Sequence, residues 1–260
     1  MTRIARVFKE KSKVLVAYIT AGDPTPDRTP ALVAAMERGG ADLIELGVPF
    51  SDPVADGPVI MRAGDRALRA GTTVAKVFAI AREIRRTSEI PLLLFTYLNP
   101  VIRYGLDRLA ADAKSSGIDG CLLTDASVEE AGSYVDAMRA AGLDTVFLAA
   151  PTSTERRLRL VARYSSGFVY LVSHTGVTGE QNAVSSSVGP LIKAVRAVTA
   201  LPLAVGFGVS RPEHVAELGA AADGVVVGSA FMRLIEEHAA SPDLEQRLEA
   251  FTRSLKDALP

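Results

Sequence analysis

The sequence contains no tryptophan, one cysteine and three histidines among its 260 residues. The single cysteine, Cys121, cannot form a disulfide within the chain, and its apolar neighbours predict a small buried side chain. The histidines are His174, His214 and His238, and their scatter matches no Cys/His pattern with zinc spacing. The sequence therefore predicts no metal site and no cofactor.

An excess of one charge and long apolar runs are also missing. The net charge is −1, which favours neither nucleic acid nor an anionic membrane as a partner. No apolar run approaches the roughly 20 residues that cross a membrane, and the first residues lack the apolar core of a signal peptide. We therefore expect a cytoplasmic protein without nucleic-acid or membrane partners.

Apolar, β-branched runs alternate with helical patterns along the whole chain. Nearly continuous apolar strands are typical of a parallel sheet covered by helices, and eight such units favour closure into a barrel. A length of 260 residues suits one (β/α)8 barrel of roughly 250 residues. We expect an α/β protein, a (β/α)8 TIM barrel as a single domain over residues 1–260, with an extra N-terminal helix across its bottom.

The expected strands are Val14–Ile19, Asp42–Leu46, Pro91–Thr96, Gly120–Thr124, Thr145–Ala149, Phe168–Val172, Leu203–Phe207 and Gly224–Val227. The expected helices are Thr2–Glu10, Thr29–Gly39, Thr73–Thr87, Asp107–Ser116, Val128–Ala141, Thr154–Tyr164, Val188–Thr199, Arg211–Leu218 and Leu244–Leu255. The segments after the strands are long and rich in Gly, Pro, Asp and Ser, as at Asn99-Pro100, and such loops form the catalytic face of a barrel.

Two acids stand out in the segment Leu43–Pro58. Glu45 interrupts an apolar strand, where a carboxylate is costly unless it is paired or used. Asp56 follows in a loop rich in glycine and proline. An ion pair on the barrel wall would also explain Glu45, and a turn cap beside Gly57 would explain Asp56.

This segment reads LIELGVPFSDPVADGP and resembles the signature of the tryptophan synthase alpha subunit family, E-L-G-x-P-[FY]-S-D-P-x-A-D-G-P, at every fixed position. The resemblance covers almost the whole chain. It implies a lyase of tryptophan biosynthesis, which cleaves indole-3-glycerol phosphate to indole and glyceraldehyde 3-phosphate. It also implies that Glu45 and Asp56 are the catalytic carboxylates.

The cleavage needs a proton delivered to the indole ring and a proton removed from the hydroxyl beside the breaking bond. A desolvated Glu45 with a raised pKa suits both transfers. Asp56, in a polar loop, should stay ionised and stabilise the positive indolenine intermediate. A Schiff-base mechanism is disfavoured because none of the lysines ends an expected strand.

A second group of residues is expected to bind the substrate phosphate. Phe207 and Gly208 end the seventh strand, and Gly228 and Ser229 follow the eighth, where Ser229 opens a short helical run. Phosphate sites recur at this place in barrels, although the glycines alone are equally consistent with tight turns. The resemblance adds Gly179 to this phosphate cradle.

The resemblance also implies a lid and an indole pocket. The lid corresponds to residues 173–187, a small polar segment too long for a plain turn, and includes Thr178. The pocket residues would be Phe95, Tyr97 and Tyr170. A plain surface loop and ordinary aromatic packing remain the alternatives.

The resemblance implies a beta-subunit partner in an alpha2-beta2 complex. Pro49, Phe50 and Asp52 should form an exposed part of the docking surface, and Asp125 another. Family members carry a proline after the position of Asp125, whereas this chain has Ala126, so docking is expected to be weaker than usual. A stand-alone indole-releasing lyase, a quiet activating subunit and another phosphate-binding barrel enzyme remain alternatives.

Overall fold

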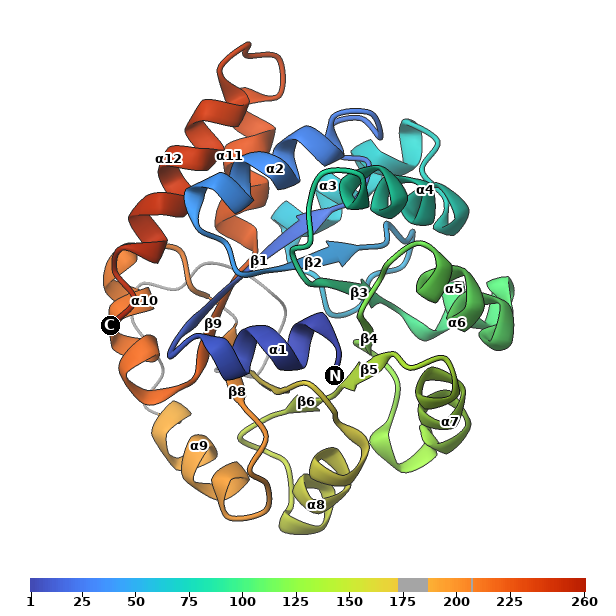
Figure 1. Cartoon of the computed structure of the whole chain (residues 1–260), viewed down its shortest axis with the longest axis vertical. Helices are drawn as coiled ribbons and strands as arrows, with labels where there is room; N and C mark the ends of the chain where they lie inside the picture. The colour runs from blue at the N-terminus through green and yellow to red at the C-terminus, as the bar shows by residue number, and fades with distance from the viewer. Residues whose placement is uncertain (173–186, 207) are drawn as a thin grey trace.

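Parallel strands form one sheet in the computed structural model, which describes residues 1–172, 187–206 and 208–260. The strand order is β5-β4-β3-β2-β1-β9-β8-β7-β6. The strands are β1 Val14–Thr20, β2 Leu43–Gly47, β3 Leu92–Thr96, β4 Gly120–Leu123, β5 Asp144–Val146, β6 Leu148–Ala149, β7 Val169–Val172, β8 Leu203–Gly206 and β9 Gly224–Val227. β5 and β6 are two parts of one strand interrupted at Phe147, so the sheet closes into the expected barrel (Figure 1).

Helices surround this barrel on its outside (Figure 1). They are α1 Arg3–Glu10, α2 Thr29–Gly39, α3 Pro58–Arg69, α4 Val74–Arg85, α5 Leu98–Tyr104, α6 Leu106–Ser115, α7 Gly132–Ala140, α8 Glu155–Tyr164, α9 Val188–Arg196, α10 Pro212–Ala221, α11 Ser229–His238 and α12 Leu244–Lys256, with a 3-10 helix, η1, at Val128–Glu130. None of the helices in the described ranges is long and apolar enough to span a membrane.

The predicted elements are confirmed, to within a few residues at their ends, except in four places. The expected strand Thr145–Ala149 is interrupted at Phe147. The expected helix Val128–Ala141 is divided into η1 and α7. The sequence patterns missed α3 as a helix. They also placed Asn99-Pro100 in a loop, whereas the structure has both residues in α5. Pro100 is tolerated there because it lies in the first turn, where the missing N–H has no intrahelical partner.

The N-terminal helix α1 lies across one end of the barrel, as expected (Figure 1). Its N-cap is Thr2, whose hydroxyl accepts a hydrogen bond from the amide of Ala5. Ile4 and Val7 are buried on one face of the helix. The ring of Phe8 packs on Phe168, with centroids 5.3 Å apart. The helix therefore covers the amino-terminal ends of the strands and leaves their carboxyl ends free.

An aspartate precedes β2, β4 and β9, and each contacts the neighbouring strand. The Oδ2 atoms of Asp42, Asp119 and Asp223 accept hydrogen bonds from the amides of Leu15, Leu92 and Leu203 at 2.7, 2.9 and 2.7 Å. Such a bond satisfies an amide that the sheet ladder leaves unpaired at its end. The three acids therefore fix the starts of adjacent strands relative to one another.

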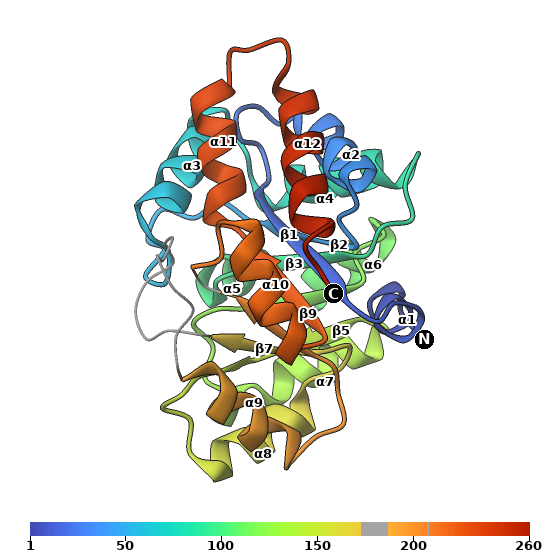
Figure 2. The same ribbon diagram turned by 90° about the vertical axis from the view of Figure 1, so that its left-hand side faces the viewer.

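Helices α3 and α11 lie side by side on the barrel (Figure 2). Arg66 of α3 forms a bidentate ion pair with the buried Asp23, at 2.8 and 2.9 Å, and contacts Glu236 of α11 at 2.7 Å. Arg62 also contacts Glu236, at 2.7 Å. Since α3 follows the loop of Asp56 and α11 begins at Ser229, these ion pairs join the two helices that leave the catalytic rim.

Candidate active site

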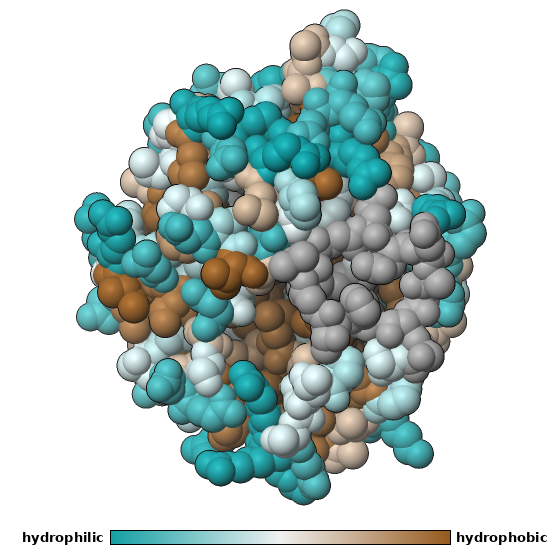
Figure 3. All heavy atoms as spheres, turned by 180° about the vertical axis from the view of Figure 1, so that it is seen from behind, coloured by the Kyte–Doolittle hydropathy of each residue, from teal (hydrophilic) through white to brown (hydrophobic). Residues whose placement is uncertain are grey.

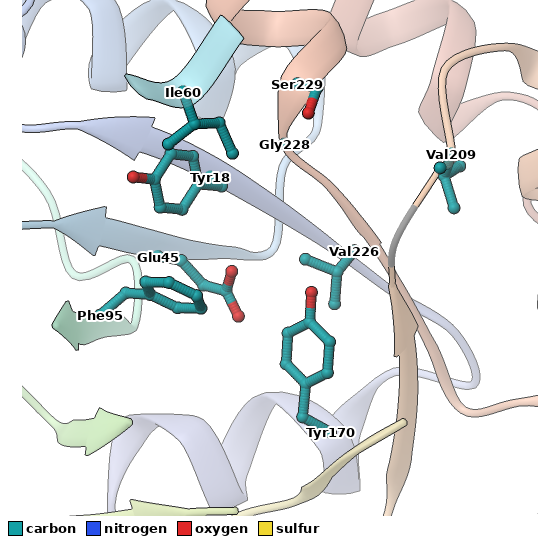
Figure 4. Close-up of a pocket in the computed structure, with 10 residues that line it drawn as sticks. Tyr18, Glu45, Ile60, Phe95, Tyr170, Val209, Val226, Gly228 and Ser229 are labelled. Carbon is teal, nitrogen blue, oxygen red and sulfur yellow. The ribbon is translucent and has the colours of Figure 1, made fainter. Parts of the chain in front are cut away.

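A pocket lies at the carboxyl ends of the strands, and Glu45 is at its centre (Figure 4). The described residues that line it are Tyr18, Glu45, Ile60, Phe95, Tyr170, Gly208, Val209, Val226, Gly228 and Ser229. On the face opposite α1 the surface is hollowed near its middle, and apolar side chains line the hollow (Figure 3). The sequence-predicted residues Glu45, Phe95, Tyr170, Gly208, Gly228 and Ser229 are thus brought together.

Glu45 occupies the third position of β2 and is 1 % exposed. Its Oε1 atom has no hydrogen-bond partner within the described ranges, and no ion pair to it is found there. The alternative of an ion pair on the barrel wall is therefore wrong for the part of the chain that the structure describes. Burial raises the pKa of Glu45 to about 8, so this carboxyl group is mostly protonated at neutral pH.

Asp56 is buried, which corrects the expectation of a solvated carboxylate in a polar loop. It is 9 % exposed, because the loop folds back over Tyr97, whose hydroxyl accepts a hydrogen bond from the amide of Ala55 at 3.2 Å. Burial raises the pKa of Asp56 to about 6, while a hydrogen bond from the Tyr97 hydroxyl lowers it. Asp56 therefore remains mostly ionised at neutral pH, as expected, although for a different physical reason.

Two tyrosine hydroxyls lie against glycines on the adjacent strands. A Cβ atom on Gly47 would lie 2.3 Å from the Tyr18 hydroxyl oxygen, and one on Gly206 would lie 2.2 Å from that of Tyr170. Glycine is therefore required at both positions if the rings are to lie in the pocket. The ring of Phe95 contacts Tyr18 edge to face, with centroids 5.3 Å apart, so the pocket has an aromatic wall.

Gly228 and Ser229, two of the predicted phosphate residues, lie on the opposite side of the pocket from Phe95 (Figure 4), and Gly208 also lines the pocket. Ser229 is the first residue of α11, and Gly228 is its N-cap. The amides of a first helical turn have no intrahelical acceptor and carry partial positive charge. Gly208 has φ of 86°, a left-handed conformation that favours glycine. The free amides at the start of α11 suit an anion. The left-handed Gly208 is also consistent with the alternative that the glycines form tight turns.

Three of the predicted site residues lie outside the described residues. These are Thr178, Gly179 and Phe207, and the expected lid, residues 173–187, is described only at Ser187. The pocket is therefore described by the lining residues given above.

The residues predicted to dock a partner differ in exposure. Pro49 is buried, so the expectation that it is exposed is wrong. Phe50 is half-buried against Tyr97, with ring centroids 5.4 Å apart, and Asp52 is exposed. Asp125 is exposed, and its Oδ1 accepts a hydrogen bond from the Leu98 amide at 2.7 Å. Asp125 thereby caps the start of α5.

Sequence reasoning missed four lining residues: Tyr18, Ile60, Val209 and Val226. A signal existed for Tyr18, because side chains alternate between the two faces of a strand. Tyr18 is the register partner of Glu45 on the adjacent strand, so both side chains point into the barrel. The other three are apolar residues whose sequence context resembles any core position.

Within the described ranges, no three side chains of His, Cys, Asp or Glu gather as a metal-binding group. The pocket instead combines one protonated acid, Glu45, with an aromatic wall and a helix N-terminus. Asp56 and Tyr97 are not among its described lining residues, but the charge of the ionised Asp56 acts on Tyr18, which lines the pocket. This combination can bind an aromatic phosphate and move a proton onto and off it.

A family model and individual known proteins place the sequence in the same family. A family model described as tryptophan synthase alpha chain matches residues 4–260. The tryptophan synthase alpha chain of Solibacter usitatus is 73% identical over 260 residues, covering 98% of this chain and 97% of the relative. That of Geotalea uraniireducens is 50% identical over 260 residues, with the same coverage of 98% and 97%.

Solved structures agree with this result. The tryptophan synthase alpha subunit of Legionella pneumophila superposes with a TM-score of 0.89 at 37% identity, covering 100% of this chain and 98% of that one. A structure of Mycobacterium tuberculosis tryptophan synthase gives a TM-score of 0.92 at 36% identity, covering 99% of this chain and 98% of that one.

Proposed function

The chain belongs to the tryptophan synthase alpha chain family and cleaves indole-3-glycerol phosphate in tryptophan biosynthesis; from this premise we propose how its own residues perform the reaction. The observation that carries the proposal is Glu45, a fully buried acid whose Oε1 lacks a hydrogen-bond partner among the described residues. It faces the same pocket as the start of α11. A buried acid of this kind is costly unless the substrate uses it.

Glu45 is the proton carrier of the cleavage. Its protonated carboxyl donates to C3 of the indole ring, which gives an indolenine with positive charge at the ring nitrogen. The resulting carboxylate then accepts the proton of the hydroxyl on the adjacent carbon. As that proton leaves, the bond between C3 and this carbon breaks, its electron pair neutralises the indolenine, and the hydroxyl becomes the aldehyde of glyceraldehyde 3-phosphate.

Asp56 stabilises the intermediate through its charge. With a pKa of about 6 it is mostly ionised at neutral pH, and a carboxylate in a site of low dielectric interacts strongly with a nearby positive charge. The opposite ionisation states of Glu45 and Asp56 follow from their surroundings: Glu45 has no described hydrogen-bond donor to its Oε1, while Asp56 has the Tyr97 hydroxyl.

The rest of the pocket orients the substrate. We propose that the phosphate binds at Gly208, Gly228 and Ser229, where the first amides of α11 face it. Gly179 and Phe207 remain part of this phosphate site from the family resemblance, and Thr178 remains a proposed lid residue. The indole ring would lie against the aromatic wall formed by Phe95 and Tyr170, with Tyr97 beside Asp56.

We further propose that the chain works with a tryptophan synthase beta subunit. Four large apolar side chains are exposed on or beside the catalytic rim: Val54, Met61, Leu98 and Ile102, with exposed fractions of 74, 44, 36 and 65 %. Val54 belongs to the Asp56 loop, and Leu98 and Ile102 belong to α5, whose start Asp125 caps. Exposed apolar groups of this kind are typical of a protein interface.

The partner proposal predicts stimulation of indole release. Addition of the beta subunit should raise the rate by about 5–150-fold, the range of ordinary coupling between sites, because docking on the Asp56 loop should fix Asp56. The measurement is the rate of indole release from indole-3-glycerol phosphate as the cognate beta subunit is titrated in. Ordering Ala126 and Ser127 costs about 1 kcal/mol per residue, so half-maximal stimulation should need a relatively high concentration of partner.

Matched variants locate the docking surface. Ile102→Asp places a charge on the exposed face of α5 and should weaken stimulation while leaving the rate without partner unchanged. Ala216→Asp makes the same kind of change at an exposed position of α10 and should leave stimulation intact. A high rate for the chain alone, unaffected by the beta subunit, would instead identify a stand-alone lyase, and no indole in either state would identify a quiet subunit.

A further inference from the structure

Asp56 has an incomplete set of hydrogen bonds for an ionised carboxylate. Its Oδ1 atom is buried and has no hydrogen-bond partner among the described residues. The hydroxyl of Tyr97 bonds to Asp56 but has only one proton to donate, and it also accepts from the amide of Ala55. A buried carboxylate oxygen without a donor is unfavourable, so the site has room for a second donor.

Tyr18 carries a hydroxyl group that the proposed reaction does not use and on which the charge of Asp56 acts. It is 6 % exposed and is the register partner of Glu45. Its hydroxyl lies against Gly47, the residue from which the chain leaves β2 toward Asp56. Figure 4 shows this hydroxyl pointing away from the Glu45 carboxyl group, which is turned toward Tyr170 and Val226.

The present hydrogen bond of Tyr18 is long for two hydroxyl groups, and its direction is not fixed. The hydroxyl lies 3.2 Å from Oγ1 of Thr20, and either oxygen could be the donor. If Thr20 donates, the proton of Tyr18 is free for another acceptor. Burial raises the pKa of Tyr18 well above its usual value, and the charge of Asp56 raises it further. The Tyr18 hydroxyl therefore stays protonated and lies within the electrostatic reach of Asp56.

We propose that Tyr18 is a positioning residue for Asp56: its hydroxyl accepts from Thr20 and donates to Oδ1 of Asp56 when substrate is bound. Tyr18 and Tyr97 then hold the Asp56 carboxylate from two sides, one oxygen each. Hydrogen bonds of this kind are often long in a free enzyme and shorten in the substrate complex. This proposal rests on the role of Asp56 given above and adds a device that keeps Asp56 ionised and aimed at the indolenine.

The groups that could affect the ionisation of Asp56 are few in the described part of the pocket. Tyr97 lies at the N-cap of α5 and bonds to Asp56, and Tyr18 approaches from β1. Glu45 projects from β2 and is mostly protonated at neutral pH. Tyr170 approaches from β7 and senses the charge of Glu45 and Tyr18 rather than that of Asp56. Tyr97 and Glu45 also act on Tyr18, but more weakly than Asp56 does, so a change of the Tyr18 hydroxyl should act chiefly on Asp56.

The test is the pH profile of kcat for indole release by Tyr18→Phe, which removes one oxygen atom and keeps the ring; kcat reports pKa values in the substrate complex, where the proposed bond forms. Loss of a donor to the ionised form raises the pKa of a carboxyl group. The acid limb of this profile, which Asp56 sets in the substrate complex, should move up by about 1 unit relative to the unmodified protein, and kcat at neutral pH should fall by on the order of tenfold. Thermal unfolding checks that the fold is retained.

Two control variants separate this role from general packing. Tyr170→Phe removes the other hydroxyl of the pocket and should leave the acid limb in place. Thr20→Val removes the present partner of Tyr18 but keeps the Tyr18 hydroxyl, and should also leave the acid limb in place. An unmoved acid limb in Tyr18→Phe would overturn the proposal, and so would an equal shift in Thr20→Val. Absence of indole release by the unmodified chain would instead overturn the proposed mechanism itself.

Discussion

Replacing Glu45 with glutamine should reduce the rate of indole release by about 10²–10⁴-fold, the usual contribution of a general acid–base group. Glutamine has nearly the same shape but carries no transferable proton. No second acid that lines the described part of the pocket is available to replace it. The measurement is the steady-state rate of indole formation from indole-3-glycerol phosphate at saturating substrate.

The control for this variant is Glu217→Gln, the same change at an exposed position of α10, which should retain the full rate. Binding of glycerol 3-phosphate to Glu45→Gln should also be retained, because the phosphate is assigned to the start of α11. A rate within a few-fold of the unmodified protein would remove Glu45 from the mechanism, whereas a loss of glycerol 3-phosphate binding would indicate that the pocket had collapsed.

Replacing Asp42 with alanine should reduce the free energy of unfolding by about 1–3 kcal/mol, the cost of leaving a buried hydrogen-bond donor without its partner, while its partly exposed lysine partners add less. The side chain of Asp42 is fully buried, accepts the Leu15 amide at 2.7 Å, and pairs with Lys11 and Lys256. Its loss leaves the buried Leu15 amide of β1 without an acceptor. It also removes the ion pairs to Lys256 of α12 and to Lys11, which follows α1. Denaturant unfolding followed by circular dichroism measures the change.

Asp136→Ala is the matched control, because Asp136 is an exposed aspartate on α7; its effect should stay within about 0.5 kcal/mol. A loss below about 1 kcal/mol in Asp42→Ala would mean that water satisfies the Leu15 amide and that the aspartate before β2 does not hold the adjacent strand.

The strands were predictable because a parallel barrel buries both faces of each strand, which leaves nearly continuous apolar runs. The helix α3 was not, because its buried face is built largely from Ala63, Gly64 and Ala67, residues too small to give a clear helical period. The helix α5 was obscured by Asn99 and Pro100, which are common turn residues. In both cases, packing against the barrel stabilises a helix that the local sequence alone does not favour.

The two acids that we propose as catalytic, Glu45 and Asp56, illustrate the same limit of sequence-based prediction. Glu45 could be singled out because its own strand is apolar, so burial follows from the residues beside it. The burial of Asp56 depends on Tyr97, which lies far along the chain at the start of another helix. Tyr18 was within reach of sequence reasoning through strand alternation, but pairing it with Glu45 requires the register between β1 and β2.

The central claim is that burial keeps Glu45 protonated at neutral pH, ready to transfer a proton to the indole ring. The most direct test is a carbon-13 NMR titration of the glutamate carboxyl groups, in which the signal of Glu45 is identified by its loss in Glu45→Gln. We predict a midpoint near pH 8, well above those of the exposed glutamates. A midpoint near 4.5, the ordinary value for glutamate, would contradict the account.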